Sequence, residues 1–268
     1  MYIIVEKRPL SETAMLMSIH APQAAEKALA GQFVLIRPQA ESRPTVLMIA
    51  ETDRRAGEIT VIFHCTGPAA KMLAAREVGD ALAGFSGPFG QESRPPTAEK
   101  VIAVCGGMGC AALYPKIKGL YAAGARVDVI AGFRSRGSVL LEDQLRAHCT
   151  SLTLSTEDGS CGRQGSASLL LHERLQRESY QLAIAAGPVG LLQAVCTLTK
   201  KLDLPTTVTL HPAVTDEEGR CSCCRIAVDR QIKCACTDGL DFNGNGIDWS
   251  AQAETAATNF CPLLEKRN

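Results

Sequence analysis

The chain has 268 residues, a formal net charge of zero at pH 7, and hydrophobic and charged fractions of 46% and 21%. This balance is that of a globular protein with a core of normal size, and the length allows more than one domain of about 100–200 residues. The neutral charge excludes a strongly basic nucleic-acid binder, and no apolar run approaches the roughly 18–20 residues that a membrane span needs.

Residues 1–90 have the pattern of short β-strands. Apolar segments bounded by Pro, Gly or Asp recur at short intervals, and none has a long helical period. They lie at residues 13–22, 31–38, 45–51 and 57–65. This spacing predicts an antiparallel barrel or sandwich. A stretch rich in Gly, Pro and Ser at residues 86–100 is the expected domain boundary.

Beyond this boundary strands and helices alternate, which predicts a parallel α/β sheet. Runs such as VIAV and LAIAA are continuously apolar, as expected for strands covered on both faces. We expect strands at residues 101–107, 126–133, 151–158 and 180–187, and helices at 111–123, 140–148, 167–177 and 188–202. From about Thr206 to Trp249 the chain becomes loop-rich and cysteine-rich, and a polar tail follows.

Twelve cysteines are many for a chain of this length. The N-terminal stretch has charges inside its apolar part and lacks the layout of a secretion signal, so we expect a cytoplasmic protein. In that compartment metal binding explains clustered thiols better than disulfides do. Six thiols are scattered through apolar or small-residue segments and are expected to be core residues. Five of the remaining six crowd into sixteen residues: Cys221, Cys223, Cys224, Cys234 and Cys236.

The crowded thiols predict an iron–sulfur centre. Such clusters need several thiolates that converge on one point, usually from a tight loop and one more distant ligand. Cys221 and Cys224 form a C-x-x-C pair, and Cys236 follows twelve residues later, across an expected hairpin at residues 225–235. A structural zinc site is the alternative that these residues leave open.

The segment VIAVCGGMGCAA predicts a strand, a tight turn and a helix. Gly106, Gly107 and Gly109 would let the backbone approach a phosphate at the helix N-terminus, although their spacing is not the G-x-G-x-x-G fingerprint. Loops at 156–162 and 186–190 also follow strands, and ligands of such sheets bind at the carboxyl ends of strands. A tight turn without a ligand is the plainer alternative.

Arg43 stands just before an expected barrel strand. A guanidinium there can clamp a diphosphate through paired hydrogen bonds. A surface arginine in a turn explains the position equally well.

Several motifs, in order, resemble one family. It is the family of electron-transfer subunits of the sulfide dehydrogenase and dihydroorotate dehydrogenase type, which includes the small subunit of NADH-dependent ferredoxin:NADP oxidoreductase. The resemblance covers roughly residues 1–250. It is carried by MYIIVEKRPLSETAMLMSI, GQFVLIRP, GPFG, VCGGMGCAALYP, GFRSRGSVLLEDQL, STEDGSCGRQG, AIAAGPVGLLQAVCTLTKK and the C-terminal cysteine cluster.

This resemblance implies a ferredoxin-NADP-reductase-like fold. An FAD-binding β-barrel would occupy residues 1–98, an NAD(P)-binding α/β domain 99–205 and a 2Fe–2S lobe 206–250, with a tail at 251–268. A hydride would pass from NAD(P)H to FAD, and single electrons would leave through the cluster. The implied partner is a larger flavoprotein and iron–sulfur subunit that resembles the glutamate synthase small subunit, through which ferredoxin is reached.

The resemblance also implies particular site residues, none of them catalytic. The transhydrogenase branch resembles D-x4-C-x2-C-x11-C, whereas dihydroorotate-type members usually have a cysteine in place of the aspartate and a longer final gap. Cys223 and Cys234 have no family role. The implied cluster ligands are Asp216, Cys221, Cys224 and Cys236, and the implied nucleotide contacts are Gly106, Gly107, Gly109, Asp158, Gly159, Gly187 and Pro188.

The flavin site departs most from the family. Its members usually read R-x-P-L-T at the flavin strand, where this chain has Arg43, Pro44 and Thr45. Where the family offers G-x-[ST]-T, this chain has Gly67 followed by Pro68, Ala69 and Ala70, so two hydroxyl donors are missing. Backbone N–H groups can still bind a diphosphate, so FAD is expected.

Three alternatives stay open beside this electron-transfer role. The chain could be a non-catalytic relay or structural subunit with a degenerate flavin site. It could be the electron-transfer subunit of a dihydroorotate dehydrogenase B. It could also be a zinc-binding regulatory module fused to a nucleotide sensor. Arg134 and Arg136 could contact a 2′-phosphate, but they do not decide between NADH and NADPH.

Overall fold

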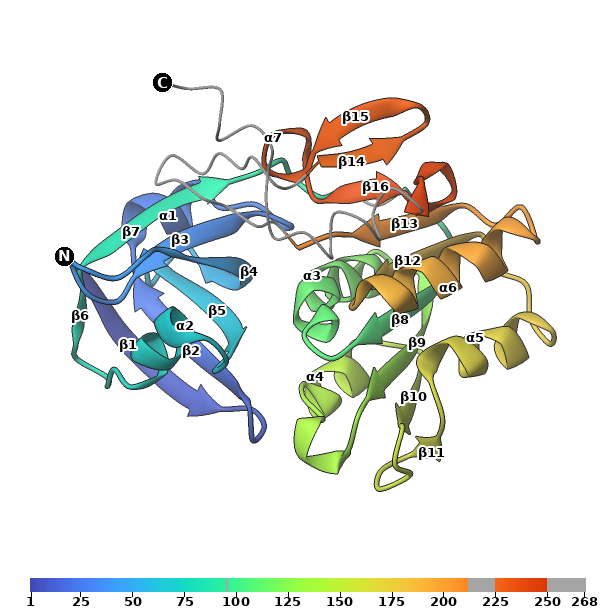
Figure 1. The fold of residues 1–268 in the computed structure, drawn as a ribbon, viewed down its shortest axis with the longest axis horizontal. Helices are drawn as coiled ribbons and strands as arrows, with labels where there is room; N and C mark the ends of the chain where they lie inside the picture. The colour runs from blue at the N-terminus through green and yellow to red at the C-terminus, as the bar shows by residue number, and fades with distance from the viewer. Residues whose placement is uncertain (95, 212–224, 250–268) are drawn as a thin grey trace.

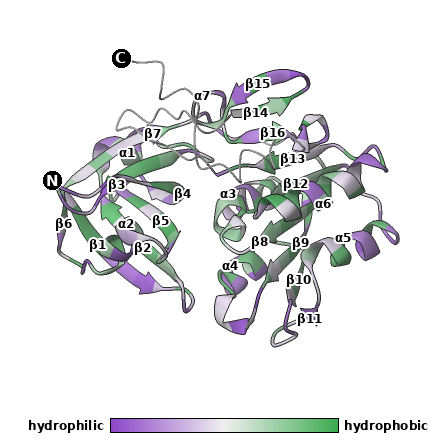
Figure 2. Ribbon diagram, viewed as in Figure 1, coloured by the Kyte–Doolittle hydropathy of each residue, from purple (hydrophilic) through white to green (hydrophobic). Residues whose placement is uncertain are grey.

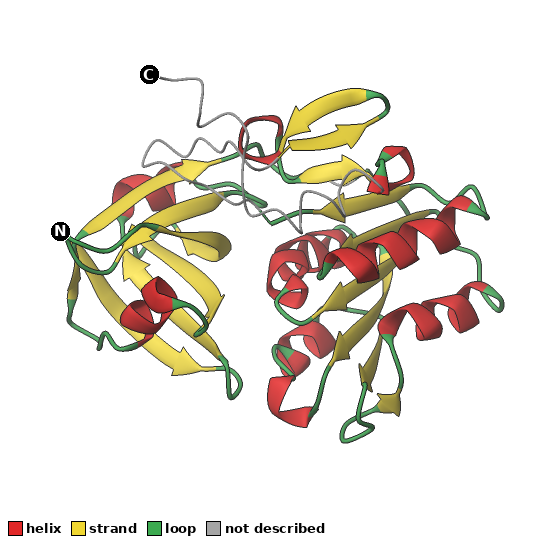
Figure 3. Ribbon diagram, viewed as in Figure 1, coloured by secondary structure: helices red, strands yellow, loops and turns green. Residues whose placement is uncertain are grey.

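The computed structural model describes residues 1–94, 96–211 and 225–249. Two seven-stranded sheets and a small hairpin make up its strands. Figure 1 shows the first sheet and the second side by side, with the hairpin lying above the second. Helices gather around the second sheet, as Figure 3 shows, and only two short ones accompany the first.

The first sheet is an antiparallel barrel with the strand order β6-β1-β2-β5-β4-β3-β7. Its two end strands are joined through a single residue, Ala83, so the sheet nearly closes. The strands are β1 (Tyr2–Pro9), β2 (Ala14–His20), β3 (Phe33–Arg37), β4 (Thr45–Asp53), β5 (Glu58–His64), β6 (Ala81–Leu82) and β7 (Gly84–Phe89). The predicted antiparallel barrel is confirmed.

Two short helices of the barrel were not expected from the sequence. They are α1 (Pro22–Lys27) and α2 (Pro68–Ala74), and a proline stands at the first position of each. Proline is favoured there because its fixed φ suits a helix start and its missing N–H would have no partner. Both are too short to give an amphipathic period that a sequence pattern can reveal.

The second sheet has the order β11-β10-β9-β8-β12-β13-β16 and is parallel except for β16. Its strands are β8 (Lys100–Gly106), β9 (Arg126–Phe133), β10 (Ser151–Thr156), β11 (Arg163–Gln164), β12 (Leu182–Ala186), β13 (Thr206–Thr209) and β16 (Asp241–Asn243). The helices are α3 (Gly109–Ala122), η1 (Arg136–Ser138), α4 (Glu142–Ala147), α5 (Ala167–Leu175) and α6 (Val189–Lys200). The predicted parallel α/β sheet is confirmed.

Both faces of this sheet are covered. Val101 and Ala103 of β8 belong to a core with side chains of α3 and α4, whereas Ile102 and Val104 belong to a core with side chains of α5 and α6. Alternate residues of one strand thus serve opposite layers, which explains the continuous apolar runs. Figure 2 shows the central strands as the most hydrophobic part of this half.

The C-terminal segment forms a hairpin of β14 (Arg225–Val228) and β15 (Gln231–Cys234). Its two turn residues, Asp229 and Arg230, have φ of 50° and 65°, the left-handed pair that two-residue hairpins require. The hairpin predicted at residues 225–235 is confirmed. Helix α7 (Ala235–Asp238) and the 3-10 helix η2 (Gly244–Gly246) follow. Two strands from the stretch 206–250, β13 and β16, belong to the parallel sheet rather than to a separate lobe.

The barrel packs directly on the second sheet's helix α3. Ala14, Leu16 and Ala50 of the barrel share one buried core with residues of α3. At the rim of this contact the N–H of Glu12 donates to the carbonyl oxygen of Gly137 at 3.1 Å. No helix within the described residues is long and apolar enough to cross a bilayer.

Candidate functional site at the carboxyl edge of the parallel sheet

The glycine turn after β8 lies where the order of the parallel strands reverses. β8 has β9 on one side and β12 on the other, so the β8–β12 boundary is the switch point of the sheet. Ligands of open parallel sheets bind in the crevice outside the carboxyl ends of such strands. Gly106 ends β8 and Ala186 ends β12, and therefore the first and last of the predicted loops meet at this point.

Three glycines allow these two loops to touch. A Cβ on Gly109 would lie 2.1 Å from the carbonyl oxygen of Ala186, and one on Gly106 would lie 2.8 Å from Cδ2 of Leu191. A Cβ on Gly187 would lie 3.1 Å from the backbone nitrogen of Gly106. A side chain on Gly109 would force the start of α3 away from β12, whereas one on Gly106 or Gly187 would press on Leu191 of α6. Gly109 is therefore required by the packing of α3 on β12.

Gly107 differs from its neighbours. Its φ of +52° is left-handed, and a Cβ there would meet no atom within 4 Å. The turn is thus open on its outer side, next to the start of α3, where no side chain caps the helix. The N-terminus of a helix attracts anions through its backbone N–H groups and dipole. The open space and the helix end fit the diphosphate of a dinucleotide.

The loop after β10 lies at the same edge, two strands away. Oδ1 of Asp158 accepts from both the N–H and the hydroxyl of Ser160, at 2.9 and 2.6 Å, and these bonds lower the pKa of the Asp158 carboxyl. The hydroxyl of Ser160 in turn accepts from the N–H of Arg136 at 2.8 Å. Gly159 makes the turn with φ of +76°. This loop is therefore tied to the one after β9, and among the described residues no hydrogen bond or ion pair joins it to Gly106–Gly109.

Two thiols flank the glycine turn. Cys105 and Cys110 are fully buried, with their sulfur atoms 2.9 Å apart. Burial raises the pKa of the Cys110 thiol well above its usual value, which disfavours the reactive thiolate. Both thiols are core residues, as expected for cysteines outside the C-terminal cluster.

The predicted flavin residues lie at one end of the barrel. Thr45 begins β4 and Gly67 follows β5, and these strands are antiparallel with Ile49 opposite Val61, so both lie at the same end. Gly67 has φ of +83° and open space around its missing side chain. Arg43 is exposed and has no hydrogen-bond or ion-pair partner among the described residues.

Most of the predicted cluster ligands lie outside the described residues. These ligands are Asp216, Cys221 and Cys224. Cys223, which has no implied role as a ligand, also lies outside the described residues. Cys236 belongs to α7, directly after the β14–β15 hairpin. Cys234 ends β15 and is half-buried. The described residues contain no group of three or more His, Cys, Asp or Glu side chains placed to hold a metal ion.

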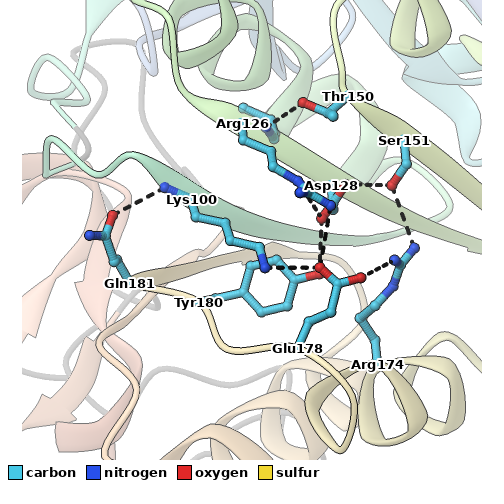
Figure 4. A network of polar contacts seen from close by, with 10 residues as sticks. Lys100, Arg126, Asp128, Thr150, Ser151, Arg174, Glu178, Tyr180 and Gln181 are labelled. Atoms are coloured by element: carbon cyan, nitrogen blue, oxygen red, sulfur yellow. Dashed lines mark hydrogen bonds and ion pairs between the residues drawn. The ribbon is translucent and has the colours of Figure 1, made fainter.

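A charged network occupies the opposite edge of the sheet, where the strands begin (Figure 4). Glu178 accepts from Arg174 at 2.9 Å and pairs with Lys100 at 2.9 Å, and these partners lower the pKa of Glu178 to about 2. Fully buried Asp128 accepts from the Tyr180 hydroxyl at 3.0 Å. Because its charges are satisfied internally and it lies away from the switch point, this network is structural.

One buried polar cluster in the structure has no counterpart among the sequence motifs. Lys116 of α3, Thr209 of β13 and Asp241 of β16 bond to one another beneath the C-terminal segment. Lys116 stands two residues before a second lysine, Lys118, and nothing in the sequence marks it as the buried one. Its partner follows 125 residues later, beyond the reach of any local pattern.

The chain is similar to known proteins over most of its length. It is 35% identical over 258 residues to an uncharacterised protein from the adh 3′ region of Clostridium beijerinckii, covering 93% of this chain and 87% of the relative. It is 31% identical over 247 residues to a Thermotoga maritima homologue of the electron-transfer subunit of dihydroorotate dehydrogenase B (NAD(+)), covering 92% and 87%. No protein-family model matches the chain.

A solved structure shares the whole fold. It is a chain of NADH-dependent reduced ferredoxin-NADP oxidoreductase, described in connection with flavin-based electron bifurcation. The TM-score is 0.88 at 27% identity, and the match covers 97% of this chain and 94% of that one.

Proposed function

The chain belongs to the family of the electron-transfer subunit of dihydroorotate dehydrogenase B and its homologues, and from this premise we propose that it transfers electrons between NAD(P)H and a larger catalytic subunit. The family resemblance drawn from the sequence motifs is thereby confirmed. We propose FAD and a 2Fe–2S cluster as the cofactors of this chain. The partner that we propose is a flavoprotein and iron–sulfur subunit resembling the glutamate synthase small subunit.

The observation that carries the proposal is the meeting of two glycine turns at the switch point of the parallel sheet. Gly107 leaves open space beside the start of α3, Gly109 lets that helix end lie against the end of β12, and Gly106 makes room for Leu191 of α6. We propose that this helix end holds the diphosphate of NAD(P)H and that Gly187 and Pro188 line the nicotinamide. Asp158 and Gly159 would contact the far end of the dinucleotide.

The barrel residues fit a flavin diphosphate in part. Gly67 offers an open, left-handed turn before α2, and Arg43, which has no partner among the described residues, lies at the same end of the barrel. Arg43, Pro44, Thr45 and Gly67 would hold FAD, although Ala69 and Ala70 offer no hydroxyl. When bound, FAD supplies the conversion of a two-electron hydride into single electrons. The packing of β4 on α3 holds the two halves together, and this packing would keep the proposed flavin and nicotinamide sites in a fixed relation.

The cluster would be held by Asp216, Cys221, Cys224 and Cys236. When bound, a 2Fe–2S cluster supplies one-electron transfer, and a carboxylate ligand is harder than a thiolate and would alter its potential. Aspartate in the first position supports the transhydrogenase branch of the family over the dihydroorotate branch.

The test is the cofactor content of the anaerobically purified chain. We expect about one FAD, about two irons and about two acid-labile sulfides per chain. Iron and sulfide without flavin would support the second candidate, a relay subunit with a degenerate flavin site, which the missing hydroxyls at Ala69 and Ala70 favour. Zinc without sulfide would overturn the electron-transfer assignment.

A further inference from the structure

Lys116 is a buried lysine on the helix that begins at the glycine turn. Its side chain is 2% exposed, and its ammonium group donates to the Thr209 hydroxyl at 2.5 Å and to Oδ1 of Asp241. A lysine is rarely buried this far unless a carboxylate and hydrogen-bond acceptors surround its charge. The proposed nucleotide, flavin and cluster sites do not include Lys116 or Asp241. The burial of this pair therefore needs a separate explanation.

Asp241 connects the lysine to two further parts of the chain. Its Oδ1 also accepts from the Thr209 hydroxyl at 2.8 Å, and its Oδ2 accepts from the hydroxyl of Ser93. Ser93 lies between β7 of the barrel and β8 of the parallel sheet. Thr209 ends β13, opposite Asp241 in the ladder with β16. The carboxylate therefore joins the nucleotide-side helix, the sheet and the interdomain segment.

Asp241 also stands at the point where the C-terminal segment joins the sheet. It begins β16, separated from α7 by Gly239 and Leu240, and it follows Cys236 by five residues. Other contacts also hold this junction: β16 pairs with β13, and Leu240 and Phe242 are buried in the core of the sheet. The N–H of Leu210 donates to the carbonyl of Leu240 at 2.8 Å, and Gln91 donates to the carbonyl of Thr237 at 3.2 Å.

The physics of a buried pair makes this contact specific. Desolvation lowers the pKa of Lys116, while the neighbouring Asp241 acts in the opposite direction and favours the charged form. A buried pair adds little net stability over apolar residues of the same size, but the loss of one partner leaves an uncompensated charge. If β16 shifted by one residue along β13, Asp241 would lose its bonds to Lys116, Thr209 and Ser93. The pair therefore selects one register of β16 and one position for the C-terminal segment.

We propose that Lys116 is a positioning residue that clamps the C-terminal segment 225–243 onto the nucleotide-binding sheet through Asp241. What this segment carries rests on the proposed function, in which it provides Cys236 as a cluster ligand. The clamp fixes the segment to the same helix whose first turn faces the nucleotide site. It thereby sets the position of the C-terminal electron-transfer segment relative to the nucleotide-binding half.

Hydrogen exchange of the full chain, followed by mass spectrometry, tests the clamp. We expect Lys116→Met and Asp241→Asn each to speed exchange of amides in residues 225–243 by about tenfold or more, with strand 100–106 unchanged. Lys116→Arg keeps the cation and its donors and should retain most of the protection. Lys118→Met is the matched control, because it removes an exposed pair with Glu51 from the same helix. It should leave residues 225–243 protected.

Several outcomes would overturn the clamp. Unchanged exchange in 225–243, or exchange that rises equally over the whole chain, would reduce Lys116 to a general contributor to stability. Failure of Lys116→Arg to restore protection, or an equal effect of Lys118→Met, would do the same. If Lys116→Met does not fold, Asp241→Asn decides. Iron content measured on the same samples separates the two proposals, since a wild-type chain without iron refutes the cluster and leaves the exchange result standing.

Discussion

The carbonyl oxygen of Ala186 lies 2.1 Å from the place that a Cβ would take on Gly109. This contact joins the start of α3 to the end of β12, and so closes the switch point on one side. Because Gly109 has no side chain, the helix, the turn and the strand can pack closely in this one arrangement. The relationship explains why the turn is glycine-rich without matching a known dinucleotide fingerprint.

Replacement of Gly109 by alanine should therefore destabilise the protein. The methyl group would clash with backbone that cannot rotate away, at a cost of about 1–3 kcal/mol in the free energy of unfolding. Gly119 is the control, since it lies in the same helix and a Cβ there meets nothing within 4 Å. Gly119→Ala should stabilise by about 0.5–1 kcal/mol. Urea unfolding of both variants measures the difference, and equal effects would contradict the packing role of Gly109.

Gly107→Ala tests the nucleotide site rather than the packing. The methyl group would enter the open space beside α3, and it would also strain a left-handed backbone by ~1–2 kcal/mol. We expect NADH affinity, measured by calorimetry, to fall by about tenfold or more. Gly124→Ala carries the same kind of strain, with φ of +89° and open space, but lies at the other end of α3. Equal losses of affinity in both variants would rule out a direct role for Gly107.

Glu178 should make stability depend on acid pH. Its folded-state pKa is lowered to about 2 by hydrogen bonds from Lys100 and Arg174, below its ordinary value of 4.5. The stabilisation is therefore complete above about pH 4.5 and is lost as the pH falls toward 2. Glu178→Gln should flatten this part of the stability curve, measured by thermal unfolding between pH 5 and 3. An unchanged slope would show that the network of Figure 4 does not lower the pKa of Glu178 in the folded protein.

Cys236 and Cys234 offer a matched pair for the cluster. Cys236→Ser should lower iron and acid-labile sulfide strongly, because a hydroxyl is a poor ligand for iron in such a centre. Cys234→Ser, two residues away on the end of β15, should retain both. Metal analysis of the two purified variants decides, and the reverse pattern would move the fourth ligand position to Cys234.

Strands with continuous apolar runs were predicted well from the sequence. The strand expected at residues 126–133 coincides with β9, and the hairpin expected at residues 225–235 forms around left-handed Asp229 and Arg230. Both depend on local information, namely a buried run in one case and a two-residue turn in the other.

Contacts between distant segments could not be predicted in this way. β16 is three residues long and joins the sheet through its pairing with β13, not through its own pattern. The pair of Lys116 and Asp241 depends on that same pairing. The glycine loops were found because strand ends share an edge, but the contact of Gly109 with Ala186 requires the strand order, which a sequence pattern does not give.

Anaerobic titration of the purified chain with NADH tests the electron-transfer assignment most directly. We expect stepwise loss of the flavin absorbance, followed by reduction of the cluster seen as a new electron paramagnetic resonance signal. Both should require less than a few equivalents of NADH. A chain that contains flavin and iron but shows no spectral change with either NADH or NADPH would contradict the assignment.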